Sequence, residues 1–200
     1  MYYHLLGFCV FVALLSAFFD PRTQKNKVES VSDKNVILDN GFDDVTVVNG
    51  LANLHNQSFT ALLVNGAASI YGVTVLQGTI INGSAYLEHS RFKDLEINGS
   101  ADCTTIWVDR VISVNGSARF KKSQFNIMYI RGNQCDLIDT RVNGPIWVMS
   151  VQNGLGNTKE HILLVDTIVD GDIIFESKQG TVELQGTSKV LGNVIGGSVF

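Results

Sequence analysis

The chain has 200 residues, with 19 glycines, 16 asparagines, only two prolines and a formal net charge of −4. A collagen-like chain is excluded because no three-residue glycine period exists, a coiled coil because alanine, glutamate, lysine and leucine do not dominate, and an apolar content of 45% argues against disorder. Valine and isoleucine are abundant, and β-branched side chains favour strands, so one mainly β domain is expected.

An uncharged apolar run, LLGFCVFVALLSAFF, occupies residues 5–19. It is shorter than the roughly 20 residues needed to span a membrane, and it fits the apolar core of a secretory signal peptide, although residues 1–4 lack the usual lysine or arginine. Ser16-Ala17 supplies small residues for cleavage. Residues 1–17 are therefore interpreted as a signal peptide or, if uncleaved, an N-terminal anchor; a buried core segment is the third alternative. Export to the periplasm or outer membrane is expected, with membrane contact only through this segment if it is retained.

Residues 18–35 are polar and charged (FFDPRTQKNKVESVSDKN), which is typical of a flexible arm. No later stretch is apolar for long enough to span a membrane as a helix. Residues 36–200 are therefore expected to form the folded domain.

The dipeptide Asn-Gly, preceded by Val or Ile, recurs along this domain at alternating steps of 16 and 17. The five copies are Asn49-Gly50, Asn65-Gly66, Asn82-Gly83, Asn98-Gly99 and Asn115-Gly116. Arg131-Gly132 continues the series with the shorter of the two steps, and Asn143-Gly144 and Asp170-Gly171 follow at looser spacing. A fixed period of this kind indicates a repeat architecture.

Within each repeat, apolar residues form pairs that are two positions apart, which is the spacing of one strand face. A helix would show spacings of three and four instead. Three short strands per repeat predict an all-β, single-domain parallel β-helix: a triangular solenoid of 16–17 residues per coil, with coils stacked about 4.8 Å apart. The alternative, an antiparallel barrel with Asn-Gly hairpins, is less favoured because its turn signals would recur about every 8–12 residues.

Residues 36–200 would supply eight to ten such coils. The repeat is less regular after Gly144, and the stretch from Gly144 to Gly171 is longer than one coil needs. The excess predicts a loop near 152–161 (QNGLGNTKEH).

Asn-Gly is expected at one corner of the triangle, because both residues tolerate left-handed backbone conformations. Asparagines at the same corner of successive coils can join their side-chain amides in a ladder of hydrogen bonds. The same role is assigned to Asn143 and Gly144. The expected core includes Phe92, Phe120, Phe125, Ile97 and Val114.

Cys103 and Cys135 are the only cysteines after the leader, and their separation in the sequence equals two coils. If they stack in one column, two strand spacings separate them by about 9–10 Å, whereas a disulfide needs Cα atoms within about 7 Å. Two free, buried thiols and no disulfide are predicted.

No catalytic residues, cofactor or metal site are predicted. The candidate side chains fall at different phases of the repeat: His55, His89, Asp94, Asp102 and Asp109. The tripeptide Asp170-Gly171-Asp172 offers too few oxygen ligands for calcium. A nucleic-acid partner is not expected, because the chain is acidic rather than basic.

The VNGSA units and the closing SKVLGNVIGG resemble the bactofilins, polymer-forming bacterial cytoskeletal proteins. That resemblance covers roughly residues 44–197 and implies a three-sided β-helix that self-assembles. Bactofilins usually lack a secretory leader, whereas this chain carries a candidate one.

The expected function is a non-enzymatic scaffold of a bacterial cell envelope, self-assembling or docked in a larger complex such as a secretion-system outer-membrane core. Protein partners are therefore expected. The alternative is a secreted adhesin or glycan-binding module, with Tyr71, Tyr86 and Trp107 as candidate aromatic contacts, although they share no phase. A hexapeptide acyltransferase is the least favoured, because three hexapeptide units make a longer coil than this repeat allows and no histidine is well placed.

Overall fold

The computed structural model describes residues 36–38, 45–150 and 159–200. The predicted leader and arm (1–35) and most of the predicted loop (152–158) lie outside these residues. The described residues form an all-β parallel solenoid with two sheets, one of nine strands and one of 14. The fold class predicted from the repeat is confirmed.

The nine-stranded sheet forms the first side of every coil. Its strands, in pairing order, are β3 (Ala52–His55), β6 (Ala68–Tyr71), β8 (Ala85–Glu88), β10 (Ala101–Thr104), β12 (Ala118–Lys121), β14 (Gln134–Ile138), β17 (His161–Val165), β20 (Gly180–Gln185) and β23 (Gly197–Val199). Nine strands mean nine passes, within the predicted eight to ten coils. His161, placed in the predicted loop, is instead the first residue of β17.

The 14-stranded sheet forms the second and third sides. Its main path is β1 (Val36–Leu38), β2 (Val45–Asn49), β5 (Ala61–Asn65), β7 (Thr74–Asn82), β9 (Arg91–Ile97), β11 (Trp107–Asn115), β13 (Gln124–Arg131), β15 (Arg141–Val142), β18 (Ile168–Val169) and β21 (Lys189–Val190). Beside this path lie β4 (Ser58–Phe59), β16 (Ile146–Val148), β19 (Ile173–Phe175) and β22 (Val194–Ile195). Only β1 pairs antiparallel among the described strands, with β2.

One coil shows how the chain closes. After β8 the chain turns at His89, runs along β9 through a bend near Lys93, and turns again at Asn98-Gly99. β10 then pairs with β8, so that Ala101 lies opposite Ala85. In later coils the second and third sides are separate strands, such as β15 and β16.

The longer coils take their extra residue at the bend between the second and third sides. Val108 pairs with Phe92 and Val111 with Asp94, so Asp109 and Arg110 together face Lys93. Leu76 and Gln77 make the same irregularity in β7. Each repeat of 17 residues therefore contains a β-bulge that the repeats of 16 residues lack, and the bulge leaves the core register intact.

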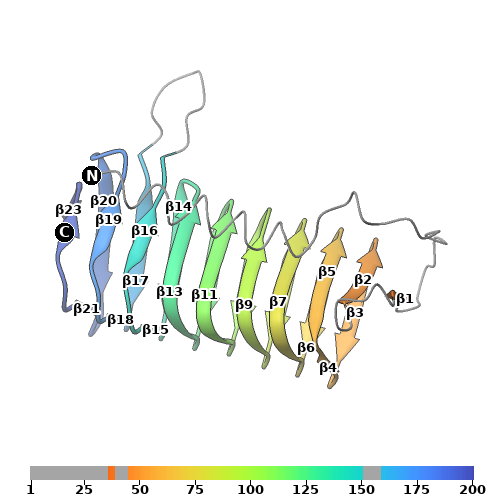
Figure 1. Cartoon of the computed structure of the whole chain (residues 1–200). Coiled ribbons are helices and arrows are strands. Elements are labelled where there is room, and N and C mark those ends of the chain that lie inside the picture. The colour runs from red at the N-terminus through yellow and green to blue at the C-terminus, as the bar shows by residue number, and fades with distance from the viewer. Residues whose placement is uncertain (1–35, 39–44, 151–158) are drawn as a thin grey trace. The chain divides into compact units, whose positions relative to one another are not determined.

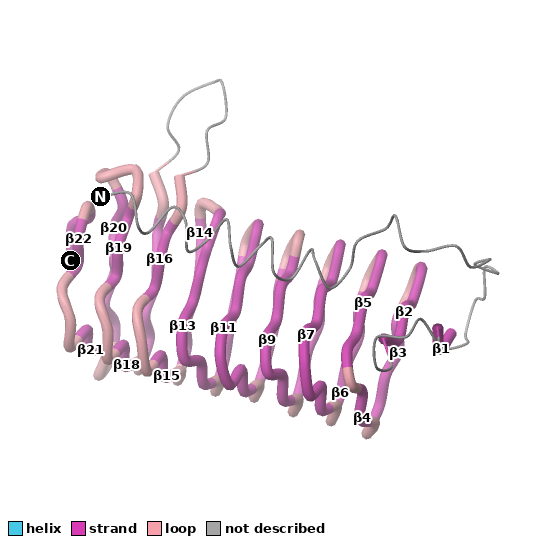
Figure 2. Tube along the Cα trace, viewed as in Figure 1, coloured by secondary structure: helices cyan, strands magenta, loops and turns pink. Residues whose placement is uncertain are grey.

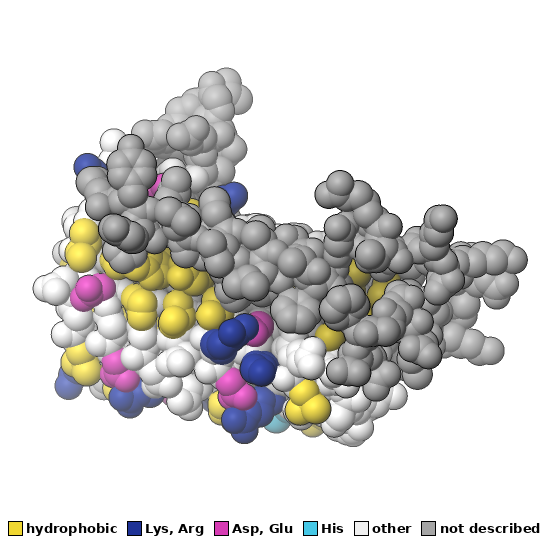
Figure 3. All heavy atoms as spheres, in the orientation of Figure 1, with side chains coloured by type: hydrophobic (Ala, Val, Ile, Leu, Met, Phe, Trp, Pro, Cys, Tyr) yellow, Lys and Arg dark blue, Asp and Glu magenta, His cyan; other side chains and the backbone are white. Residues whose placement is uncertain are grey.

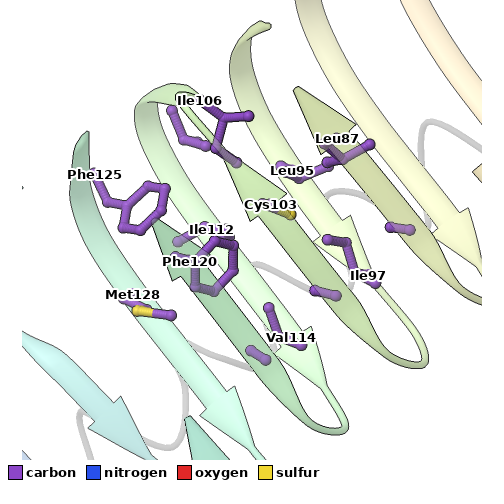
Figure 4. Close-up of a cluster of buried hydrophobic side chains, with 14 of the residues drawn as sticks. Leu87, Leu95, Ile97, Cys103, Ile106, Ile112, Val114, Phe120, Phe125 and Met128 are labelled. Carbon is purple, nitrogen blue, oxygen red and sulfur yellow. The ribbon is translucent and has the colours of Figure 1, made fainter. Parts of the chain in front are cut away.

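The core is a continuous column of apolar side chains inside the coils (Figure 4). The predicted core residues are all fully buried: Phe92, Ile97, Val114, Phe120 and Phe125. The rings of Phe120 and Phe125 meet edge to face with centroids 4.9 Å apart. Each buried side chain of this size contributes about 1.5–3 kcal/mol, so burial holds the coils together.

The stacked coils form a rod that runs from β2 to β23 (Figure 1). Nine coils at about 4.8 Å give a length of roughly 38 Å between the first and last strands. Short loops join the strands at the corners (Figure 2). No helix among the described residues is long and apolar enough to cross a membrane.

Candidate functional site: corner ladders and exposed sides

The asparagine side chains at one corner form a chain of hydrogen bonds from coil to coil. The Nδ2 of Asn65 donates to Oδ1 of Asn49 over 2.9 Å, and Asn82 donates to Asn65 and Asn98 to Asn82 at the same distance. Asn115 donates to Asn98. Each inner amide thus both donates and accepts.

The glycines beside these asparagines are required by space as well as by backbone conformation. Gly66, Gly83, Gly99 and Gly116 have φ between +145° and +153°. A Cβ on any of them would lie 2.1–2.2 Å from the carbonyl oxygen of the preceding corner glycine. No side chain fits at that distance, so the close stacking of the coils at this corner requires glycine.

The ladder ends where Arg131 takes the asparagine position, although Gly132 still stacks on Gly116. The Oδ1 of Asn115 is buried and has no hydrogen-bond partner among the described residues. The Asn115 oxygen thus lacks the donor that a further asparagine at position 131 would supply.

The assignment of Asn143 and Gly144 to this ladder is wrong. The register pairs Val142 with Phe125 and Ile146 with Met128, which places Asn143-Gly144 at the bend between the second and third sides. A Cβ on Gly144 would lie 2.6 Å from the Asn126 carbonyl oxygen. A second tight corner thus selects glycine, because backbone again packs against backbone.

The third corner follows the nine-stranded sheet and was not recognised in the sequence. One residue per coil there has φ of about +49° to +66°: Asn56, Gly72, His89, Thr105, Lys122, Asp139, Asp166 and Gly186. Several residue types accept this conformation, because φ near +50° is allowed for side chains at modest cost. The corner therefore has no fixed residue letter.

Hydroxyl groups beside this corner form a second ladder, also missed. Each hydroxyl accepts a backbone N–H from the coil before, and all but Ser188 donate to the carbonyl two residues earlier in their own coil. The N–H to hydroxyl pairs are Val73–Ser90, Ile106–Ser123, Ser123–Thr140, Thr140–Thr167 and Thr167–Ser188, at 3.0–3.3 Å. A serine or threonine directly after Lys122, Asp139 and Asp166 was the available signal.

Cys103 and Cys135 are free and buried, as predicted. They do not share a column, however: Cys103 pairs with Leu87 and Phe120, whereas Cys135 pairs with Ala118. Burial raises the pKa of both thiols well above the ordinary value. Buried, protonated thiols of this kind act as core side chains.

Two of the three aspartates considered for catalysis are paired with arginines, and the third lies on another side. Asp94 binds Arg110 through both carboxylate oxygens, and Asp109 binds Arg91 at 2.9 Å. These hydrogen bonds raise the pKa of both arginines. Asp102 lies on the first side, in β10. The geometry provides ion pairs between coils rather than an acid–base pair.

His55 and His89 lie beside the ring of Tyr71. The Tyr71 ring is 6.2 Å from that of His55 and 5.2 Å from that of His89, centroid to centroid. Within the described residues no three metal-binding side chains gather.

The exposed aromatic candidates are divided between two sides. Tyr71 and Tyr86 lie on the first side, and Trp107 begins the second side at β11. Their exposed fractions are 41%, 53% and 41%. Sequence reasoning missed a further pair, Tyr129 and Trp147, which lie opposite each other on the third side.

No protein family, no curated protein and no solved structure matches this chain.

Proposed function

We propose that this chain is a non-enzymatic structural protein of a bacterial cell envelope. The rigid solenoid would associate through its third side with a protein partner, either another copy or a subunit of a larger assembly such as a secretion-system outer-membrane core. Export to the periplasm or outer membrane rests on the apolar run at residues 5–19. Self-association is also what the resemblance to bactofilins implies.

One observation carries the proposal: an apolar column on the outside of the third side. Tyr129, Trp147, Ile174 and Ile195 pair in succession from β13 to β22. Ile195 is 48% exposed and the other three are partly buried. Hydrophobic side chains gather over these coils in Figure 3.

This column lies outside the core. Along β16, Ile146 and Val148 are buried inside the coil, so strand alternation turns Trp147 outward. Apolar area covered by a partner contributes about 25 cal/mol per Å². An aligned apolar column on the outside of the solenoid therefore favours docking of a partner surface.

The ladders support a mechanical role. The core continues through the coils, while the corner amides join the earlier coils and the corner hydroxyls join the later ones. Each coil is bound to its neighbours along the corners as well as along the strands. Such an element keeps its outer surface fixed and presents it without a cost in ordering.

The chain's two tryptophans give a matched test, because Trp147 lies on the third side and Trp107 on the second. We expect wild-type full-length protein to show concentration-dependent mass in analytical ultracentrifugation, or a stoichiometric envelope complex after cross-linking. Trp147→Asp should abolish that association and Trp107→Asp should preserve it, while circular dichroism reports that both variants are folded. A strict monomer without a complex, or equal behaviour of both variants, would contradict the proposal.

A further inference from the structure

A groove of about 610 Å³ runs along the first side, across the direction of its strands. It continues from the coil of Leu51 to the coil of Gln134. Its base consists of alanines at one repeat position and of the residues before them: Ala67, Ala68, Ser84, Ala85, Ser100, Ala101, Ser117 and Ala118. The side chains one position later form its wall: Ser69, Tyr86, Asp102, Arg119 and Asp136.

The base presents one hydroxyl per coil over three consecutive coils. Ser84, Ser100 and Ser117 are exposed, and their side chains form no hydrogen bond with any described residue. Parallel pairing sets their spacing at about 4.8 Å. The groove therefore offers free hydrogen-bonding groups with the period of the solenoid.

The wall combines one aromatic ring with planar polar groups. Tyr86 is 53% exposed, and its hydroxyl lies 3.5 Å from Oε2 of Glu88. The Nη2 of Arg119 lies 3.4 Å from Oδ2 of Asp136. Asp102 is exposed and its carboxylate has no ion-pair partner among the described residues. Two carboxylates against one guanidinium make the wall unfavourable for a polyanion.

An extended peptide fits this groove poorly. Its residues advance by about 3.3 Å, which does not match the coil spacing. Peptides that add to a sheet pair with a strand edge, whereas this groove crosses a sheet face whose interior strands are already paired on both edges. The occupant must instead be recognised through side-chain hydroxyls, an aromatic face and planar polar groups.

We propose that this groove binds a neutral linear glycan, a chain of β-1,4-linked pyranose units lying along the axis of the solenoid. Each sugar advances by close to one coil, so each serine of the base meets one sugar. Because successive β-1,4-linked units are flipped, the hydroxyls come from alternating ring edges. The apolar face of one sugar ring packs on Tyr86. Ring hydroxyls donate hydrogen bonds to the Asp102 carboxylate and accept them from the Arg119 guanidinium. The site is separate from the third side and does not depend on the function proposed there.

The test uses cellohexaose and chitohexaose as neutral β-1,4-linked probes, titrated into the full-length protein. The controls are a 1,6-linked glucose hexamer and an acidic galacturonate hexamer. We expect saturable binding of at least one β-1,4-linked probe by calorimetry, with amide chemical-shift changes confined to the coils from Leu51 to Asp136. Neither control should bind comparably.

Two tyrosines on the same side separate groove binding from general surface binding. Tyr86→Ala should weaken binding about tenfold, the scale of one interface anchor. Tyr71→Ala, which removes an exposed ring outside the groove, should leave affinity unchanged. Ser100→Tyr should block the groove.

Thermal unfolding followed by circular dichroism checks that each variant is folded. The proposal is overturned if no β-1,4-linked probe binds at millimolar concentration, if the control hexamers bind equally well, or if the Tyr86 and Tyr71 variants lose the same affinity.

Discussion

The coils from Asn49 to Ile130 and those from Arg131 onward are built on the same sheets but hold their corners differently. In the earlier coils an Asn-Gly corner recurs once per coil and its amides are joined. In the later coils that amide ladder is absent from the described residues, and Gly144 and Gly171 lie at another bend. Both sheets nevertheless continue in register through the two regions.

The hydroxyl ladder explains how the later coils manage without the asparagines. It is interrupted in the earlier coils, where Val73 and Ile106 stand at hydroxyl positions, and it is continuous from Ser123 to Ser188. The amide ladder is complete where the hydroxyl ladder is not. Between Asn49 and Ser188 each coil therefore has at least one corner with side-chain hydrogen bonds, and the corner differs between the two regions.

The largest effect is expected from the glycine corner of the earlier coils. Gly99→Ala would force a methyl group to 2.1 Å from the Gly83 carbonyl oxygen. Gly50→Ala meets nothing within 4 Å, although its φ of +107° carries backbone strain of its own. We expect the Gly99 variant to lose about 1–3 kcal/mol more than the Gly50 variant, measured by urea unfolding. Equal losses would show that backbone conformation alone selects these glycines.

The hydroxyl ladder of the later coils is tested by Thr167→Val. This change keeps the shape but removes the acceptor for the Thr140 N–H and a donor to the Val165 carbonyl. A buried N–H without a partner costs about 1–3 kcal/mol, so urea stability should fall by that amount. Thr104→Val, at a partly buried strand position, is the control and should change stability little. If Thr167→Val leaves the urea stability unchanged, the hydroxyl ladder does not stabilise the later coils.

Each hydrogen bond of the amide ladder in the earlier coils should contribute less to stability than a bond of the hydroxyl ladder, because the asparagines are more exposed. Asn82→Ala removes the bond to Asn65 and the bond from Asn98. Two such bonds contribute about 1–2 kcal/mol together. The exposed Asn53 in β3 is a control, and Asn53→Ala should cost little. If the two variants unfold at the same urea concentration, the amides do not stabilise the coils.

The two regions also differ in how far they could be predicted. Asn-Gly was readable because the glycine position of that corner tolerates neither a Cβ nor an ordinary backbone conformation, so glycine recurs there beside the asparagines of the ladder. The hydroxyl corner was missed because φ near +50° accepts His89, Lys122 and Asp139 alike. Where a corner accepts many residue types, no recurring residue marks it in the sequence.

The misplaced Asn143-Gly144 has a related cause. Glycine is needed at any corner where backbone meets backbone, and two of the three corners meet that condition. A dipeptide identifies a tight corner but does not tell which one. The groove on the first side could not be predicted without the strand register, because Tyr86 and Ser100 belong to different coils and to different repeat positions.

A stabilising change is expected within the regular region itself. The hydroxyl of Thr79 is buried in the core without a hydrogen-bond partner among the described residues. Thr79→Val should therefore raise the free energy of unfolding by about 1 kcal/mol, because burying an unsatisfied hydroxyl costs that much or more. The same substitution at Thr167 should have the opposite sign. A loss at both positions would mean that Thr79 is satisfied in solution.

The smallest effect is a pH dependence confined to the later coils. Hydrogen bonds from the backbone N–H and the hydroxyl of Thr187 lower the pKa of Asp166 below its ordinary 3.8. A lowered pKa in the folded state adds stability above the unfolded-state pKa, and this stability is lost as the pH falls through the folded-state pKa. Asp166→Asn keeps an acceptor oxygen but does not titrate. Its urea midpoint relative to wild type should therefore rise as the pH falls from about 5 to about 2.

Amide hydrogen exchange should show acid weakening first around Asp166 and last near Gly72, where the same corner carries no acid. Uniform weakening along the rod would instead mean that the coils unfold as one unit and that the two regions differ in construction only.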